Sequence, residues 1–303
     1  MRYLPNIVAC VLSLAAFPLP AQVVAPPTID EQKAWRFLVH QVELGPRVPT
    51  SEAHRKTREF ILRQLAESGC TTFTQTFHAY APLLAKNVEG VNIVGITPKD
   101  SKTASLVLSA HYDTRPSADM EMNPDKRHQP IPGANDGASG VAVLLAVADA
   151  LQETPPPKPL AFVFFDLEDS GQPTDVKGYC LGSRYMAANL PPQLAEFELG
   201  INFDMVGKKD LHLPMEQYSL RAASDEVRVF WAVGAQVAPN TFVKRQGIAI
   251  YDDHVPFLER GKKFINVIDF DYSQWHTTDD SVEQCSSESL KAVGDTVLKF
   301  LFQ

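Results

Sequence analysis

Histidine and carboxylate side chains occur at five sites along the chain, most of them directly after an apolar segment. The sites are His111-Tyr112-Asp113, Asn135-Asp136-Gly137, Glu168-Asp169, Asp204 and the run Trp275 to Asp280. Imidazole nitrogens and carboxylate oxygens together suit Zn²⁺, and this set needs no cysteine ligand. If successive strands deliver these side chains to one edge of a sheet, the sequence predicts a metal site at that edge.

Asp136 lies just before a glycine-rich helix start, Asn135 to Gly140. Aspartate is also a preferred helix N-cap, so this residue on its own could be a plain cap whose charge the helix dipole favours. The 22-residue loop Thr114 to Asn135 precedes it. Loops of that length in compact domains are usually functional or disordered, which favours a functional role for Asp136.

The pair Glu168-Asp169 follows the strongest apolar run in the chain, Leu160 to Phe165. Adjacent carboxylates point in different directions in extended or turning backbone. One of them could therefore hold a metal while the other moves protons. The alternative is a pair of solvated loop acids with no role in chemistry.

His276 is the fifth candidate ligand, although a lone histidine is more often a structural residue. Here Trp275 precedes it, and Asp279 and Asp280 follow it. We expect these two acids to lie within reach of its second ring nitrogen, as the partners of metal-binding histidines do. Because the five sites occur in the order in which successive strands would supply them, a metal site is favoured over the separate structural interpretations.

Apolar periodicity predicts the elements that must position these residues. We expect strands at Thr71–Phe77, Val88–Ile96, Ser105–Ala110, Leu160–Phe165, Leu199–Phe203 and Phe264–Ile268, and helices at Ile29–Gln41, Ser51–Glu67, Ala138–Gln152, Leu181–Asn189, Asp225–Val237 and Ser286–Phe302. Alternating strands and helices predict a three-layer α/β fold, with a mostly parallel mixed central sheet and helices on both faces. We expect one domain, from about residue 28 to residue 303.

Composition and charge narrow the class of protein. The formal charge of -8 and the absence of a basic stripe argue against a nucleic-acid partner. Residues 1–21 have the pattern of a secretory signal peptide, with a membrane anchor as the alternative. The apolar run is too short to cross a bilayer, so we expect a secreted or periplasmic protein without stable membrane insertion after cleavage.

The cysteines do not form a metal-binding or redox motif. Three remain after residue 21, namely Cys70, Cys180 and Cys285, and none has CxxC spacing. Buried thiols without a catalytic role are the favoured interpretation. Whether Cys180 and Cys285 form a disulfide stays open from the sequence.

The complete pattern resembles a known family. Together with Gly182-Ser183-Arg184, the five sites are similar to those of the zinc-dependent exopeptidases, which include bacterial leucyl aminopeptidases. Within that family, Asp252 to Leu258 and Trp275 to Thr277 more closely resemble the glutaminyl-peptide cyclotransferases, or glutaminyl cyclases. The resemblance spans roughly residues 30 to 303.

The cyclase resemblance implies a role for each matching residue. The zinc ligands would be Asp136, Asp169 and His276, holding one Zn²⁺ per chain. Glu168 would transfer protons, Asp204 and Asp252 would form a supporting acid network, and Trp275 would line the substrate pocket. The implied substrates are peptides or proteins with an N-terminal glutamine, which is converted to pyroglutamate with release of ammonia.

Two positions depart from the cyclase pattern. Asp169 is shorter than the glutamate that the cyclases usually carry, and Asn266 replaces a histidine that contacts the acid network in animal cyclases. The main alternative is a secreted aminopeptidase, in which His111 and Asp204 would help hold a second zinc. A lesser alternative is a non-catalytic binding domain that keeps the fold.

Overall fold

The computed structural model describes residue 1 and residues 25–303 of the chain. The predicted signal peptide, apart from its first residue, lies outside the described residues. Among the helices that are described, none is long and apolar enough to span a membrane.

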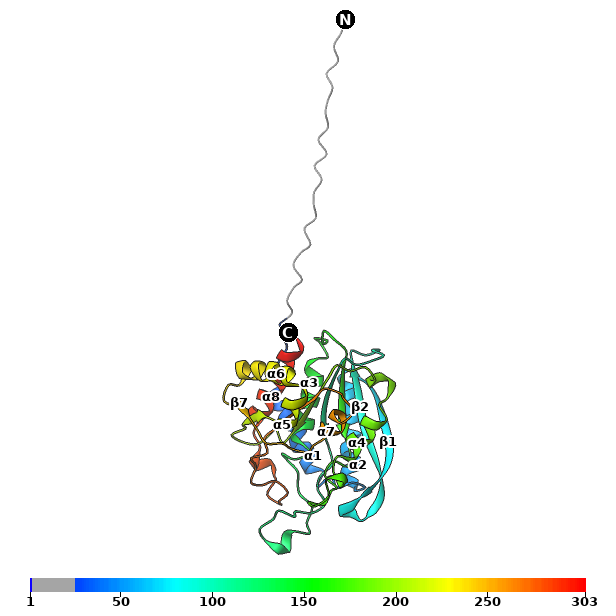
Figure 1. The fold of residues 1–303 in the computed structure, drawn as a ribbon, viewed down its shortest axis with the longest axis vertical. Coiled ribbons are helices and arrows are strands. Elements are labelled where there is room, and N and C mark those ends of the chain that lie inside the picture. The colour runs from blue at the N-terminus through cyan, green and yellow to red at the C-terminus, as the bar shows by residue number, and fades with distance from the viewer. Residues whose placement is uncertain (2–24) are drawn as a thin grey trace.

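A six-stranded sheet forms the centre of the molecule, with strand order β1-β2-β4-β3-β5-β8 (Figure 1). The strands are β1 Thr71–Ala81, β2 Lys86–Thr97, β3 Leu106–His111, β4 Leu160–Phe165, β5 Leu199–Asp204 and β8 Phe264–Ile268. Strands β4, β3, β5 and β8 run parallel to one another, whereas β1 and β2 form an antiparallel edge. The predicted mostly parallel mixed sheet is confirmed.

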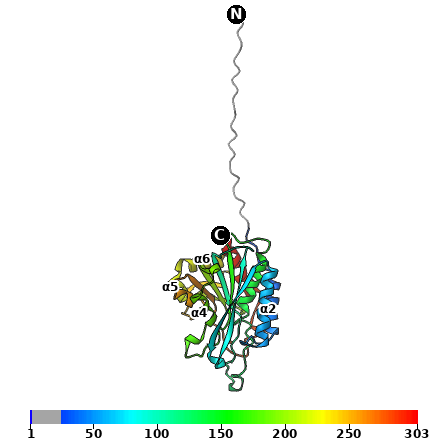
Figure 2. The same cartoon turned by 90° about the vertical axis from the view of Figure 1, so that its right-hand side faces the viewer.

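Helices cover both faces of the sheet, as Figure 2 shows edge-on for α2 and α4. The helices are α1 Glu31–Glu43, α2 Glu52–Glu67, α3 Ser139–Ala150, α4 Leu181–Ala188, α5 Gln217–Ala222, α6 Ser224–Val237, α7 Val255–Leu258 and α8 Ser287–Leu301. Because side chains alternate along a strand, Phe162 and Phe164 of β4 join the core beneath α1, α2, α3 and α8. Val163 and Phe165 instead pack with residues of α4 and α7. This burial on both faces explains the continuous apolar run in β4.

Four short elements were not predicted. They are β6 Leu213–Met215, β7 Phe242–Gln246, α5 and α7, and β6 pairs in parallel with β7 to form a separate two-stranded sheet. Segments of three to six residues are too short to show a helical or strand period. By contrast, the predicted bounds of β4 and β8 match those observed.

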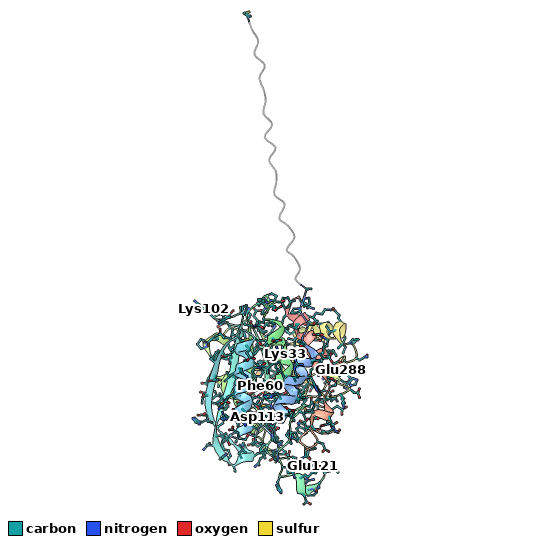
Figure 3. The ribbon with its side chains drawn as sticks, turned by 180° about the vertical axis from the view of Figure 1, so that it is seen from behind. Lys33, Phe60, Lys102, Asp113, Glu121 and Glu288 are labelled. Atoms are coloured by element: carbon teal, nitrogen blue, oxygen red, sulfur yellow. The ribbon has the colours of Figure 1, made fainter. Side chains whose placement is uncertain are left out.

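The carboxyl ends of the parallel strands meet at one edge of the molecule. In Figure 3, Lys102 precedes β3 at one end, and Asp113 follows it near the other, beyond which the loop carrying Glu121 projects. Helix α3 begins at the same edge in close contact with the sheet. A Cβ atom on Gly140 would lie 2.2 Å from the carbonyl oxygen of Phe203, so only glycine allows this approach.

Candidate active site

The five sites predicted from the sequence converge on two groups of side chains that share Asp136. One group is His111, Asp136 and Asp204, and the other is Asp136, Asp169 and His276; within each, the ligand atoms lie within 4.8 Å of one another. The Nε2 atom of His111 lies 3.2 Å from an oxygen of Asp136 and 3.2 Å from an oxygen of Asp204. The Nε2 atom of His276 lies 3.3 Å from Asp169 Oδ1 and 3.8 Å from Asp136 Oδ2.

These distances fit the donor set of a tetrahedral zinc site. Zinc-ligand bonds of about 2.0–2.1 Å place neighbouring ligand atoms roughly 3.3 Å apart. Asp169 Oδ2 is buried and has no hydrogen-bond partner among the described residues. A buried carboxylate oxygen without a partner is costly unless a cation or proton satisfies it, so the group of Asp136, Asp169 and His276 suits a divalent metal.

The structural alternatives for the two acid sites are wrong. Helix α3 starts at Ser139 with Ala138 at its cap position, so Asp136 is not its N-cap. The backbone N–H groups of Asn135 and Asp136 donate to Asp280, which fixes the turn that carries Asp136. Asp169 is 1% exposed, so it is not a solvated loop acid.

His276 has a carboxylate partner, but a different one from those expected. Its Nδ1 atom lies 3.4 Å from Asp119 Oδ1, on the long loop Thr114 to Asn135. The prediction that Asp279 and Asp280 lie near this nitrogen is wrong, because Asp279 is exposed and Asp280 instead accepts from the backbone of Asn135 and Asp136. A carboxylate on the second nitrogen orients a metal-binding histidine and raises its basicity.

Arg115 contacts both Asp169 and Asp119, and the sequence analysis did not predict this role. Its buried guanidinium donates to Asp169 Oδ1 at 2.7 Å and forms a bidentate pair with Asp119, at 2.8 and 2.7 Å. One arginine thus holds both a candidate ligand and the partner of His276. The only signal in the sequence was the length of the loop, because neither residue stands next to a candidate ligand.

Glu168 turns away from the candidate ligands although it neighbours Asp169. The carboxylate of Asp113 accepts hydrogen bonds from the N–H groups of Glu168, at 3.0 Å, and Asp169, at 3.2 Å, which fixes the backbone between them. The Glu168 side chain accepts from the Cys180 thiol at 3.3 Å. Burial, followed by the nearby charges of Asp169 and Asp253, raises the pKa of Glu168 well above its usual value.

Asp252 lies near Glu168 and Cys180, and side-chain amides donate to its carboxylate. It accepts from Asn202 at 3.1 Å and from Asn266 at 2.6 Å. The residue that departs from the animal cyclase pattern, Asn266, therefore still contacts the acid. Burial, and then the charge of Asp204, raise the pKa of Asp252 to about 6.

Glu168 and the candidate ligands other than His111 line one cavity of about 250 Å³. Its walls include Asp252, Tyr179, Phe270 and Trp275. The indole of Trp275 stacks on the imidazole of His276, with ring centroids 3.7 Å apart, and packs against Phe270 at 4.9 Å. This arrangement places an apolar wall directly beside the candidate metal ligands.

The three described cysteines are buried and free, so the structure contains no bridge between Cys180 and Cys285. This agrees with the favoured interpretation of buried thiols. The thiol of Cys180 donates a hydrogen bond to Glu168, which lines the cavity.

If Asp119 orients His276, Asp119→Ala should weaken zinc binding by about 10- to 100-fold, the range found when such partners of metal-binding histidines are removed. The affinity can be measured by competition with a chelator. Asp125→Ala provides a matched control, since Asp125 is an exposed acid on the same loop. Equal zinc affinity in both variants would show that Asp119 does not support the site.

Comparisons with known proteins agree with this geometry. The model of Peptidase family M28 matches residues 92–301. The glutaminyl-peptide cyclotransferase of Drosophila melanogaster is 28% identical over 263 residues, which cover 78% of this chain and 71% of that protein. The aminopeptidase YwaD of Bacillus subtilis (strain 168) is 30% identical over 230 residues, 72% of this chain but only 45% of that longer protein.

A solved structure gives a fuller match. The glutaminyl cyclase of Bacteroides thetaiotaomicron, bound to N-acetylhistamine, superposes with a TM-score of 0.87 and 32% identity, covering 92% of this chain and 99% of that one. The likeness therefore extends over the sheet and both helical layers. Because the family model matches residues 92–301, which is more than half of the chain, this chain belongs to Peptidase family M28.

Proposed function

We propose that the protein is a zinc-dependent glutaminyl-peptide cyclotransferase, which converts an N-terminal glutamine into pyroglutamate and releases ammonia. The observation that carries the proposal is the position of Glu168, which lines the same cavity as Asp136, Asp169 and His276 but does not belong to their group. A buried carboxylate outside that group, with a raised pKa, is suited to accepting and returning a proton.

The polar residues of the site and Trp275 have separate roles in this reaction. Asp136, Asp169 and His276 would hold a Zn²⁺, which when bound polarises the γ-carboxamide carbonyl of the substrate. Glu168 accepts a proton from the attacking α-amine and returns one to the departing ammonia. Asp204 and Asp252 keep the surroundings of Glu168 in shape, and Trp275 packs against the glutamine side chain.

Ring closure also explains why no second nucleophile is needed. The α-amine and the γ-carbon belong to the same residue, so holding that residue in a bent conformation supplies much of the rate. The stacked Trp275 and the neighbouring Phe270 form the wall against which the side chain would bend. An N-terminal glutamine is therefore the part of a peptide or protein that this cavity would receive.

Hydrolysis of N-terminal residues by a two-metal aminopeptidase is the second candidate. The group of His111, Asp136 and Asp204 supports it, because its ligand atoms also lie within 4.8 Å of one another and it shares Asp136 with the group of Asp169 and His276. Two metals a few Å apart can activate water and bind the leaving group together. A binding domain without catalysis is the weakest candidate, because every group required for either reaction is in place.

The pattern of residues 1–21 supports a secreted or periplasmic location. We also infer a single domain from about residue 28 to residue 303, since both faces of one sheet are covered by helices from the whole of that range.

Two experiments test the proposal together: an assay of the substrate and the Glu168→Gln variant. Wild-type protein should release ammonia from peptides that begin with glutamine and leave their peptide bonds intact. Glu168→Gln keeps the size of the side chain but removes the base, so the rate of ammonia release should fall by at least about 10²-fold while zinc content stays the same. Faster release of free leucine from leucyl anilides than of ammonia, with the same dependence on Glu168, would assign the aminopeptidase reaction instead.

The number of zinc ions separates the two candidates independently of any substrate. We expect about one Zn²⁺ per chain by elemental analysis, little changed in His111→Ala and lost in His276→Ala. Two ions per chain, one of which disappears with activity in His111→Ala, would contradict the cyclase proposal.

Trp275→Ala should raise KM for glutaminyl peptides while zinc stays bound, because the indole supplies apolar contact and its neighbour His276 supplies the metal bond. Trp275→Phe serves as the control that keeps an aromatic ring on the imidazole. Loss of zinc from Trp275→Ala, to the extent seen in His276→Ala, would make the indole a support for the ligand and not part of the substrate pocket.

A further inference from the structure

A second cavity, of about 400 Å³, adjoins the catalytic one and shares a wall with it. Four residues line both spaces, namely Ile248, Ile250, Ile268 and Phe270. We propose that this adjoining cavity binds the part of a peptide substrate that follows its N-terminal residue, and that Arg245 pairs there with a substrate carboxylate. The inference rests on the proposed function and extends it to the rest of the substrate chain.

The shared wall lies where the substrate chain would leave the catalytic cavity. If the N-terminal side chain occupies the space beside Trp275, the following residues must pass over the rim. Ile248 on that rim is 61% exposed, a large apolar side chain that a bound peptide would cover. The adjoining cavity lies directly beyond this residue, so it is in reach of the second and third residues of a peptide.

The wall is built into the fold. The N–H of Gly247 donates to the carbonyl of Met215 at 2.8 Å, and the carbonyl of Ile248 accepts from the N–H of Gln217 at 3.1 Å. The N–H of Ile250 donates to the buried carboxylate of Glu216 at 3.0 Å. These bonds tie the wall to β6 and to the start of α5, so the two cavities keep their relative positions.

One cation on the lining, Arg245, is available to a substrate carboxylate. Two lining acids already have partners: Glu216 accepts hydrogen bonds from the N–H groups of Ser219 and Ile250, and Asp269 pairs with Lys208 at 2.9 Å. Arg245 is exposed and forms no ion pair or side-chain hydrogen bond within residues 25–303. An arginine that is not already paired is suited to bidentate binding of a carboxylate. The exposed Asp271 also lines the cavity, and it provides the opposite charge for a control.

A series of short peptides tests this assignment. Ammonia release would be compared for Gln-Ala-amide, for Gln-Glu-Ala-amide with its neutral counterpart Gln-Gln-Ala-amide, and for Gln-Ala-Glu-amide with its neutral counterpart Gln-Ala-Gln-amide. Gln-Ala-Ala with a free carboxyl end, compared with Gln-Ala-Ala-amide, separates the effect of a terminal carboxylate from that of a side-chain one. We expect at least one carboxylate peptide to exceed its neutral counterpart by roughly two- to fivefold in kcat/KM, the size of an exposed ion pair, and the advantage to shrink as salt is raised.

Variants then identify the residue responsible. Arg245→Gln should abolish the preference, Arg245→Lys should keep part of it, and Asp271→Asn should leave it equal or larger. Rates on Gln-Ala-amide should be unchanged in all three. The same preference in wild type and Arg245→Gln, or no preference in wild type, would overturn the assignment of Arg245.

The proposed function can fail separately from this inference. Ammonia from Gln-Ala-amide, with no effect of added carboxylates, would keep the cyclase and remove the adjoining cavity from substrate binding. If no peptide releases ammonia, the same series beginning with leucine, read by free leucine, tests the cavity, because its place beside the site does not depend on the reaction. A carboxylate preference in that series that disappears in Arg245→Gln would support the inference, and a flat response would overturn it.

Discussion

The site depends on a concentration of buried negative charge at the end of the sheet. Asp113, Asp136, Asp169 and Asp252 are each no more than 3% exposed. Buried carboxylates are unfavourable unless hydrogen bonds, opposite charges or protons satisfy them. Different groups satisfy these carboxylates. Backbone N–H groups donate to Asp113 and side-chain amides donate to Asp252, whereas histidine and arginine side chains contact the candidate metal ligands Asp136 and Asp169. A divalent cation would satisfy the oxygen of Asp169 that remains without a partner.

Much of this site could be predicted because its residues occupy positions set by the sheet. His111 and Asp204 are the last residues of β3 and β5, and Glu168 follows β4 within three residues. Carboxyl ends of parallel strands meet at one edge, so an apolar run ending in a ligand-type residue indicates both the strand and the site. The run Leu160–Phe165 is the plainest example, since burial on both faces leaves no polar position within it.

The residues that could not be predicted lie on loops, where no period relates spacing in the sequence to distance. Asp119 and Arg115 reach His276 and Asp169 across more than fifty positions of sequence, because the long loop folds back over the site. Asp279 is close to His276 in sequence, but the chain turns between them and leaves it exposed. Proximity in sequence was therefore misleading for the partner of the histidine.

The backbone is strained at or next to three residues of the site. His276 itself, Leu167 before Glu168 and Met205 after Asp204 all have positive φ, between 47° and 59°. Such residues cost of order 1–3 kcal/mol each and persist only where the surrounding structure enforces them. Here Leu167 and Met205 are buried, so packing holds the sharp turns that direct the adjacent acids toward the cavity. These turns orient the same acids whether the reaction is ring closure or hydrolysis, so the turns do not determine which of the two reactions occurs. In the proposed reaction the apolar wall of Phe270 and Trp275 makes the selection, because it holds the glutamine side chain so that the substrate's own amine, and not water, lies beside Glu168.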